Sequence, residues 1–476
     1  MSTALPTSSA VRSLELAADA LTPVAAALRL GSRCAFLLES VEEGARYGRY
    51  SIVGIHGRTL QVRGAEALLA GAGGTERVAG GDPLEVLRSA LPAATLPSGD
   101  PAAPLTAGIG YLAYESVAWW ERASLPPADP LDLPEAIFHL PSAVIVFDHL
   151  AQVARVATLD DAGAESRLEA TRALLATPAV AEIPSRFAAG SVPPDEDPAA
   201  RRRYEAGVAR LVAEIHAGEM LQCVLARRFT VPTRRSPIEI YRSLRRINPS
   251  PYLFYLDLAP VVPGAALVGA SPELLVRVRG DEVVTRPIAG TRPRSDDPVR
   301  DAALAEELRA DPKELAEHAM LVDLARNDVG RVAEPASVEV TTLRAIERYR
   351  HVMHLVSEVH GTLRADLDAF DAVRSVFPAG TLSGAPKVRA MEIIDELEPT
   401  RRGPYAGATG YYGVDGRLDT CITLRTALLK DGVAYFQAGG GVVADSVPSL
   451  EYEESRNKAR AMSRALEVAR ARDLWL

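Results

Sequence analysis

Two pairs of glutamates are spaced so that they could do chemistry together. Glu314 and Glu317 open the helical pattern "ELAEHAMLVDLARNDVGR" (314–331), and Glu451 and Glu454 open a second segment of helical period near the C-terminus. Residues at i and i+3 share one face of a helix, so each pair presents two carboxylates side by side. Mg²⁺ prefers oxygen ligands and usually takes one or two carboxylates together with water and substrate oxygens. The two pairs therefore predict a magnesium site.

The glutamate pairs also have structural explanations. The helix dipole stabilises acidic residues in a first turn, and Lys458 lies four residues after Glu454, where it can form an exposed ion pair. The segment 314–331, however, is apolar around much of its circumference. A carboxylate there costs several kcal/mol to bury unless a cation meets it.

A glycine run, "QAGGGVVADS" (437–446), directly precedes the second glutamate pair. Gly439, Gly440 and Gly441 lack Cβ atoms, so their backbone amides could form a nest that closes on an anionic group. Most glycine runs are only turns. Its place before an acidic pair nevertheless favours a binding site for an anionic ligand beside the metal.

The elements that must position these groups fall into two parts. Residues 182–200, rich in proline, glycine and acid, predict a linker, and residues 1–20 are expected to be frayed. The parts 21–181 and 201–476 both mix strand and helix patterns. The segment 351–360 is one of those predicted to be helical. Hairpin strands with helices grouped between them favour an α+β fold over a parallel βαβ array.

The composition is that of an ordinary globular protein: 476 residues, 47% hydrophobic and 24% charged, with a net charge of −9. No long basic stripe supports nucleic-acid binding, and no apolar run approaches the ~20 residues of a membrane helix. The N-terminus lacks a signal-peptide core. Cys34, Cys223 and Cys421 are scattered, which favours a reducing compartment without a zinc site. We expect a cytoplasmic protein that binds neither nucleic acid nor membrane.

Six motifs between about 200 and 470 resemble, in the same order, those of the chorismate-utilising enzymes. They are "RPIAGTRPR", "EHAMLVDLARNDVGR", "HVMHLVSEVHG", "FPAGTLSGAPKVRAMEIIDELE", "GATGYYG" and "QAGGGVVADSVPSLEYEESRNKA". In the first part, "LLESVEEGARYGRYSIVG" resembles the N-terminal region of the anthranilate synthase component I family. The resemblance implies an α+β fold of large antiparallel sheets packed face to face, with helices outside and a cleft between.

Two positions separate the branches of this family. Isochorismate- and salicylate-forming relatives use a lysine base to activate water. At the matching position this chain has Gln222, which cannot deprotonate water but whose amide can hold ammonia. Aminodeoxychorismate synthases typically carry a nucleophilic lysine in "PIKGT", and here Ala289 stands in "PIAGT". The resemblance thus implies the anthranilate synthase reaction. Chorismate is aminated by ammonia at ring carbon C2 and then loses pyruvate, which is the first step of tryptophan biosynthesis and is feedback-inhibited by L-tryptophan.

The resemblance also implies roles for individual residues. Glu317 and Glu454 would hold Mg²⁺, with Glu314 and Glu451 around them. Glu273 would be the general acid for the C4 hydroxyl, which requires a desolvated carboxyl. The remaining catalytic residues would be His354, for proton transfer or substrate orientation, with Gln222 and the hydroxyl of Thr381. A lone histidine in an apolar stretch is otherwise more often a hydrogen-bonded core group.

Two further sets of residues follow from the same resemblance. The substrate-binding set is Gly290, Thr291, Tyr405, Arg425, Gly439, Gly440, Gly441 and Lys458. The tryptophan-binding set is Ser40 with Pro251, Tyr252 and Leu253 of "NPSPYLFYL". The asparagine–proline–serine–proline start of that motif also fits a rigid turn.

No cysteine of this chain has the tight elbow and histidine partner of a glutaminase nucleophile. We therefore expect a separate glutamine amidotransferase subunit, component II, that supplies ammonia, and a heterotetramer of two large and two small subunits. Three alternatives stay open: aminodeoxyisochorismate synthase, aminodeoxychorismate synthase component I, and a non-catalytic tryptophan-sensing subunit.

Overall fold

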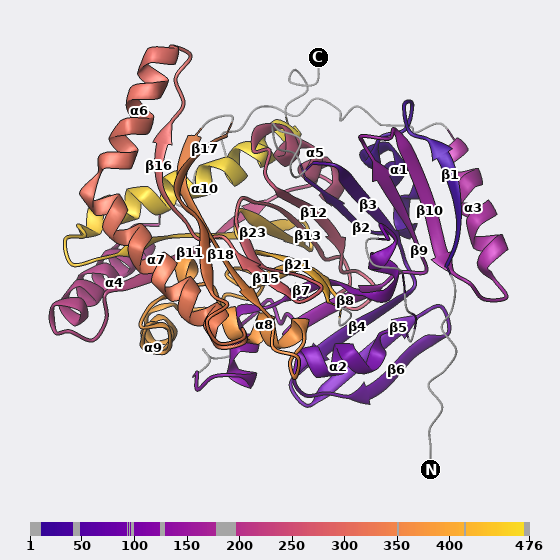
Figure 1. Cartoon of the computed structure of the whole chain (residues 1–476), viewed down its shortest axis with the longest axis horizontal. Coiled ribbons are helices and arrows are strands. Elements are labelled where there is room, and N and C mark those ends of the chain that lie inside the picture. The colour runs from indigo at the N-terminus through magenta and orange to yellow at the C-terminus, as the bar shows by residue number, and fades with distance from the viewer. Residues whose placement is uncertain are drawn as a thin grey trace.

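Two large antiparallel sheets form the body of the protein in this computed structural model (Figure 1). The structure describes residues 11–40, 48–92, 94, 96, 100–123, 129–177, 197–349, 352–413 and 416–470. The sheets pack face to face, and helices lie outside them. The predicted α+β class with antiparallel sheets is confirmed. Of the helices in these ranges, none is both long enough and apolar enough to cross a membrane.

Within the described residues the first sheet has eleven strands. Their spatial order is β1 (Val11–Ala17), β10 (Val153–Leu159), β9 (Ala143–Asp148), β3 (Tyr50–Ile55), β2 (Cys34–Glu39), β12 (Tyr252–Asp257), β13 (Ala266–Ser271), β22 (Thr426–Lys430), β23 (Val433–Val442), β11 (Gln222–Pro232) and β19 (Gly384–Ala385).

The second sheet has twelve strands within the same ranges. Their order is β16 (Ile288–Pro293), β18 (Val352–Thr362), β15 (Glu282–Thr285), β14 (Leu274–Arg279), β21 (Arg417–Ile422), β20 (Ala408–Tyr412), β7 (Gly108–Leu112), β8 (Ala136–Leu140), β4 (Arg58–Arg63), β5 (Glu66–Gly71) and β6 (Gly74–Ala79), with β17 (Glu339–Arg348) paired to β18.

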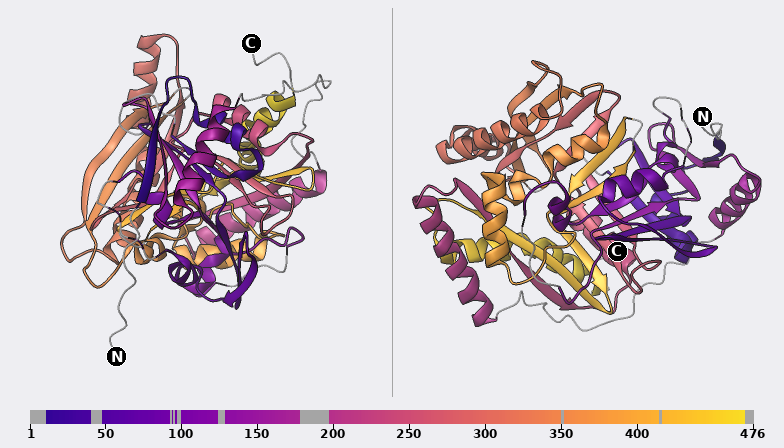
Figure 2. Two further views of the ribbon diagram at one scale, coloured as in Figure 1. Left: turned by 90° about the vertical axis from the view of Figure 1, so that its right-hand side faces the viewer. Right: turned by 90° about the horizontal axis from the view of Figure 1, so that it is seen from below.

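The helices are mostly short and begin at clear caps. They are α1 (Pro23–Leu30), α2 (Pro83–Ala90), α3 (Ala164–Ala176), α4 (Pro198–His216), α5 (Pro237–Ile247), α6 (Pro298–Ala310), α7 (Pro312–Gly330), α8 (Ala369–Val376), α9 (Lys387–Leu397) and α10 (Pro448–Arg470), with a 3₁₀ turn η4 (Gly380–Leu382). In Figures 1 and 2, α6 and β16 project together from one end of the body.

Both sheets draw strands from both parts of the sequence. In the first sheet β2 pairs with β12, with Glu39 opposite Leu253. In the second sheet β7 pairs with β20, with Gly110 opposite Gly410. The two parts are therefore interlocked rather than stacked as separate sheets. Of the expected linker, residues 182–196 lie outside the described residues, and α4 begins at Pro198 behind the capping side chain of Asp197.

Two expectations about local structure are wrong. Residues 11–17, expected to be frayed, form β1 and pair along their whole length with β10. The segment 351–360, expected to be helical, contains most of β18 instead. Its apolar positions have helix-like spacing, but it lies between β17 on one edge and β15 and β16 on the other. A strand buried on both faces carries an apolar run that period alone does not distinguish from a helix.

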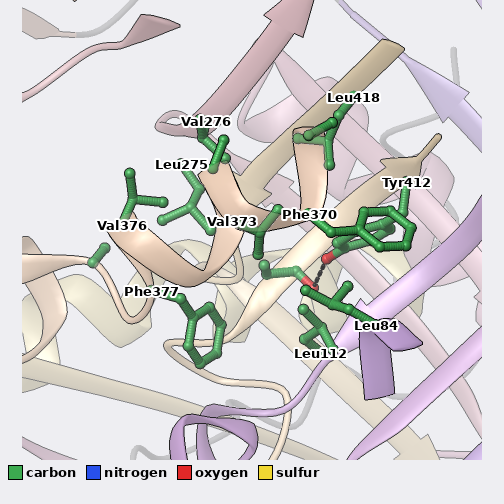
Figure 3. Close-up of a cluster of buried hydrophobic side chains, with 14 of the residues drawn as sticks. Leu84, Leu112, Leu275, Val276, Phe370, Val373, Val376, Phe377, Tyr412 and Leu418 are labelled. Carbon is green, nitrogen blue, oxygen red and sulfur yellow. Dashed lines mark hydrogen bonds between the residues drawn. The ribbon is translucent and has the colours of Figure 1, made fainter. Parts of the chain in front are cut away.

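The second sheet is covered by α8, whose apolar face fills the space beneath the site described below. Phe370, Val373 and Val376 of α8 are buried against Leu275 and Leu418 of the sheet (Figure 3). Asp368 starts this helix with a capping box, in which its side chain accepts from the amides of the first turn.

Candidate active site

The two glutamate pairs converge although they lie on helices far apart in the sequence. Asp311 caps α7 by accepting from the amides of Lys313 and Glu314, so Glu314 and Glu317 lie in its first two turns. Burial raises the pKa of Glu317, and the negative charges of Glu314 and of Glu454 on α10 add to the rise. The carboxylates of the two helices therefore share one electrostatic environment.

Glu451 contributes the least satisfied oxygen of this group. Its Oε1 accepts a hydrogen bond from Ser446 Oγ at 2.7 Å, whereas its buried Oε2 has no partner among the described residues. Burial raises the pKa of this carboxyl, and the charge of Glu454 raises it further. A buried acceptor without a donor is costly unless a proton or a cation meets it.

The donor set fits a magnesium ion that completes its shell elsewhere. Within the described part of the chain, no group of three or more histidine, cysteine, aspartate or glutamate side chains is drawn together closely enough to hold a metal alone. Glu454 is about half exposed and pairs with Lys458 Nζ at 2.7 Å. Mg²⁺ rarely depends on an all-protein cage, because it keeps waters and takes substrate oxygens. The unpartnered Glu451 Oε2 is the atom that such a cation would satisfy.

The predicted anion-binding role of the amides in the glycine run stays a prediction. Gly439, Gly440 and Gly441 lie in β23, paired in register with β11, and Gly440 stands opposite Leu225. Their missing side chains leave space. A Cβ on Gly440 would lie 2.7 Å from Glu451 Oε2, and a Cβ on Gly441 would lie 2.4 Å from the Nε2 of Gln222. Because these glycines have no side chains, polar groups can approach this part of β23 from both faces.

Gln222 begins β11 beside this strand. Its side chain is 4% exposed, and its Oε1 is buried without a hydrogen-bond partner in the described residues. An amide oxygen is an acceptor only, so a small donor would satisfy it. The position fits the expected contact with ammonia.

Glu273 has the environment that a general acid requires. It is 8% exposed, and burial raises its pKa to about 8, although a hydrogen bond from Thr381 Oγ1 and the charge of Arg425 act in the opposite direction. The Thr381 bond to Glu273 Oε1 measures 2.9 Å. The carboxyl is therefore largely protonated at neutral pH, as the sequence analysis required of it.

Arg425 lies between Glu273 and His354 and influences the pKa of both. Its backbone has a φ of 49°, which is uncommon for a residue with a side chain. Burial lowers the pKa of the guanidinium, and Glu273 partly opposes this. Nη1 donates to Asn248 Oδ1 at 3.4 Å. A half-buried guanidinium with few acceptors is suited to a carboxylate ligand.

The hydrogen bonds of His354 fix its tautomer. Nδ1 lies 2.9 Å from the carbonyl oxygen of Gly290 and 3.1 Å from Thr291 Oγ1. A carbonyl only accepts, so Nδ1 carries the proton and Nε2 keeps its lone pair. Burial lowers the pKa of the ring to about 4. At neutral pH His354 is therefore a neutral acceptor through Nε2.

Gly290 and Tyr405 are two further predicted substrate contacts. Gly290 has a φ of +61°, and a Cβ there would lie 3.0 Å from Glu314 Oε2, so the backbone of β16 approaches α7 closely. Tyr405 is buried, which raises its pKa to about 12. A series of neighbours thus runs from Glu273 through Arg425, His354 and Gly290 to Glu314.

A buried network that the sequence did not predict lies behind Tyr405. Arg402 and Glu398 are 2% and 6% exposed and form a two-bond ion pair. Tyr405 was identified by its motif, and the arginine three residues earlier in "RRGPYAG" is the available signal for the network. Single-residue chemistry did not indicate that this arginine is buried.

The predicted tryptophan-binding residues line a different cavity. Ser40, Pro251, Tyr252 and Leu253 border a space of about 720 Å³ between the two sheets. Ser40 Oγ is buried without a hydrogen-bond partner in the described residues. The hydroxyl of Tyr252 donates to Asp419 Oδ1 at 2.8 Å. The cavity is separate from the glutamates and has room for a ligand of amino-acid size.

The three cysteines are buried and unpaired with one another. Burial raises the pKa of Cys34 and of Cys223 to about 12, and that of Cys421 further. Thiols in such surroundings are poor nucleophiles.

Comparison with known proteins agrees with the geometry. Residues 35–464 match the family model described as chorismate binding enzyme. The chain is 46% identical to anthranilate synthase component 1 of Thermus thermophilus, with 95% of this chain and 97% of the relative covered. It is 44% identical to that of Pseudomonas aeruginosa, with 96% and 95% covered.

A solved structure extends the agreement to three dimensions. Anthranilate synthase component I of Streptococcus pneumoniae superposes with a TM-score of 0.77 at 35% identity, covering 94% of this chain and 98% of that one. Sequence and fold thus agree over nearly the whole length. The chain belongs to the chorismate binding enzymes and, within them, to the anthranilate synthase component 1 family.

Proposed function

We propose that this protein is the aminating subunit of a Mg²⁺-dependent, tryptophan-inhibited anthranilate synthase. It would aminate chorismate at C2 with ammonia and then eliminate pyruvate. The observation that carries the proposal is the pairing of opposite protonation states on the two sides of Arg425. Glu273 keeps its proton at neutral pH, whereas His354 has none on Nε2. One acid and one base beside a carboxylate-binding guanidinium match a reaction that adds a nucleophile and expels hydroxide.

Arg425 and Tyr405 would hold the enolpyruvyl carboxylate, because a planar guanidinium binds a carboxylate through two parallel bonds. Glu273 would donate its proton to the C4 hydroxyl, which leaves as water. Gln222 Oε1 would accept a hydrogen bond from ammonia and aim its lone pair at C2. The amination converts chorismate and ammonia into an amino acid intermediate and one water.

The second half-reaction needs a base for the hydrogen on C2. His354 Nε2 keeps its lone pair, and the Nδ1–H bond to Gly290 holds the ring in place. Removal of that proton aromatises the ring as the ether bond breaks. The enolpyruvate that leaves takes a proton and becomes pyruvate, so the balance closes at anthranilate, pyruvate and water.

Magnesium would be held by Glu317 and Glu454, with Glu314 and Glu451 close by, and the unpartnered Glu451 Oε2 supports this assignment. When bound, the ion would supply positive charge that anchors the ring carboxylate of chorismate. Lys458, paired with Glu454, would add a second positive charge at the same end.

The ammonia would come from a separate glutamine amidotransferase subunit, since the described thiols are buried and protonated. Two copies of each subunit would assemble as a heterotetramer. L-tryptophan would bind in the cavity lined by Ser40, Pro251, Tyr252 and Leu253. Ser40 Oγ has no hydrogen-bond partner among the described residues and could bond this ligand.

The test is product identification with the isolated chain. Chorismate, Mg²⁺ and an ammonium salt at high pH should give anthranilate and equimolar pyruvate, and tryptophan should suppress both. Glutamine without a partner subunit should give neither. An amino acid product without pyruvate would identify an aminodeoxyisochorismate synthase, and tryptophan binding without any turnover would identify a sensing subunit. Either result overturns the proposal.

A further inference from the structure

One buried arginine touches three of the segments that carry the site. Arg402 lies in the loop between α9 and β20 and is 2% exposed. Its Nη2 donates to the carbonyl oxygen of Val224 at 2.8 Å, and its Nη1 to that of Leu382 at 2.5 Å. Nε and Nη2 also bind the two carboxylate oxygens of Glu398, at 2.9 and 2.6 Å.

Two of these contacts lie within two residues of a proposed site group. Val224 is two residues after Gln222 on β11, and Leu382 directly follows Thr381 in η4. Arg402 itself is three residues before Tyr405. The guanidinium thus spans the ammonia contact, the hydroxyl that binds the general acid, and a substrate carboxylate contact.

The backbone around Arg402 is held as firmly as its side chain. Glu115 accepts from the amide of Arg402 at 2.8 Å and from that of Gly403 at 3.1 Å. The carbonyl oxygen of Arg402 accepts from Gln437 Nε2 at 2.8 Å, which connects the loop to β23 two residues before Gly439. Glu398 Oε1 also accepts from the amide of Ala226 at 2.8 Å, so the ion pair is bonded to β11 twice.

We infer that Arg402 is a positioning residue that sets the distances between Gln222, Thr381 and Tyr405, and thereby the affinity of the site for both chorismate and ammonia. The inference rests on the proposed function. A guanidinium is a rigid planar fork whose donors have fixed directions, and lysine offers a single flexible point charge instead. The reaction rate in a site held by such bonds falls steeply when its functional groups move by about 1 Å.

The first test is Arg402→Lys, with kcat and the two KM values measured in steady state. We expect the KM for chorismate and the KM for ammonium each to rise at least about fivefold, since both contacts lose their common support. A purely structural lesion lowers the fraction of folded enzyme, which reduces kcat and leaves both KM values unchanged.

Arg374→Lys is the matched control. Arg374 also joins distant segments, because it lies on α8 and donates to Asp82 on the cap of α2 and to Glu85 within α2. None of the segments it joins carries a proposed site residue. The control should lower the thermal midpoint in the same way as Arg402→Lys and leave both KM values within about twofold of wild type.

Chemical rescue gives a second readout. A cavity of about 50 Å³ already borders Arg402 and Tyr405, so free guanidinium at millimolar concentration has a place in Arg402→Ala. We expect it to lower both raised KM values saturably, with no such effect on Arg374→Ala. If Arg402→Lys shows no cooperative unfolding, Glu398→Gln takes its place, because it weakens the ion pair and keeps one acceptor for Ala226.

The outcomes separate the two claims. Unchanged KM values in the folded Arg402 or Glu398 variant, beside an active wild type, overturn the positioning role and leave the proposed function intact. A wild type that forms no anthranilate overturns the proposed function. In that event chorismate binding measured by calorimetry without ammonia still tests Arg402, and equal affinity in wild type and variant overturns its role.

Discussion

The proposed catalytic site and the cavity between the sheets treat charge in opposite ways. In the site, Glu273, His354 and Arg425 are buried with pKa values shifted against their charged forms. In the cavity, buried charges are neutralised by contact, as in the Tyr252–Asp419–Arg277 group with bonds of 2.7 to 3.1 Å. Shifted groups can exchange protons, whereas paired groups only shape a pocket. The first region therefore has groups suited to proton transfer, and the second has groups suited to binding.

The sharpest way to separate the regions is Glu273→Gln. The amide keeps the size and the Thr381 contact but has no acidic proton, so anthranilate formation should fall by about 10² to 10⁴ fold. Tryptophan affinity, measured by calorimetry, should not change. The control Glu282→Gln lies at the exposed start of β15. A loss of less than tenfold in Glu273→Gln would remove the residue from the role of acid.

Gly440→Ala tests the glutamate end of the site. The new Cβ would lie 2.7 Å from Glu451 Oε2, the flexible end of a side chain, so the carboxylate moves while the fold stays. We expect the Mg²⁺ concentration for half-maximal activity to rise roughly 10- to 100-fold, as when groups that support metal ligands are disturbed. Gly330→Ala is the control, because its Cβ would meet nothing within 4 Å. Equal Mg²⁺ dependence in both variants would contradict the assignment.

The pH dependence should distinguish the regions as well. With a pKa of about 8, Glu273 is protonated below that pH and loses its proton above it. The amination rate at saturating ammonia should therefore fall about tenfold per unit above pH 8, while tryptophan affinity shows no matching step. Stopped assays of anthranilate fluorescence between about pH 6.5 and 10 would reveal this fall in rate. A rate that does not fall would mean that Glu273 is not the acid.

The same shift predicts a stability trend. The folded chain keeps the Glu273 proton between the ordinary pKa of 4.5 and about 8, and the unfolded chain releases it. The contribution is thus fully present below pH 4.5 and is lost as pH rises towards 8. Glu273→Gln has no such loss, so at pH 8 its thermal midpoint should equal or exceed that of wild type. A lower midpoint would contradict the burial argument.

The smallest effect is expected in the cavity. Ser40→Ala removes a hydroxyl that has no partner among the described residues, so the free protein should be as stable as wild type. If tryptophan bonds this hydroxyl, its dissociation constant should rise about fivefold, the equivalent of roughly 1 kcal/mol. Uninhibited turnover should not change. Unaltered inhibition would exclude Ser40 from the tryptophan site.

Sequence motifs named the candidate residues without giving all the elements that carry them. Glu317 was singled out because carboxylates on an apolar helix require an explanation, and Glu454 because its spacing from Glu451 repeats that of the first pair. The segment around His354 was expected to be helical and is β18. The motif fixed the residue, but a strand buried on both faces has no period of its own. Its three neighbouring strands are non-local partners that a single segment does not specify.

The glycine run and Arg402 show two other limits. The glycine run was predicted to offer its amides to an anion, and the structure adds that the missing Cβ atoms of Gly440 and Gly441 leave the space that Glu451 and Gln222 occupy. Predicting this space requires the register of β23 against β11. Arg402 resembles any surface arginine in sequence, and only its burial against Glu398 reveals it.

The most direct test of the account is to supply the isolated chain with chorismate, Mg²⁺ and ammonium labelled with heavy nitrogen, and to identify the products by mass spectrometry. The account predicts anthranilate that carries the label in its amino group, with one pyruvate for each anthranilate. An unlabelled hydroxylated product, or no turnover of chorismate at all, would contradict it.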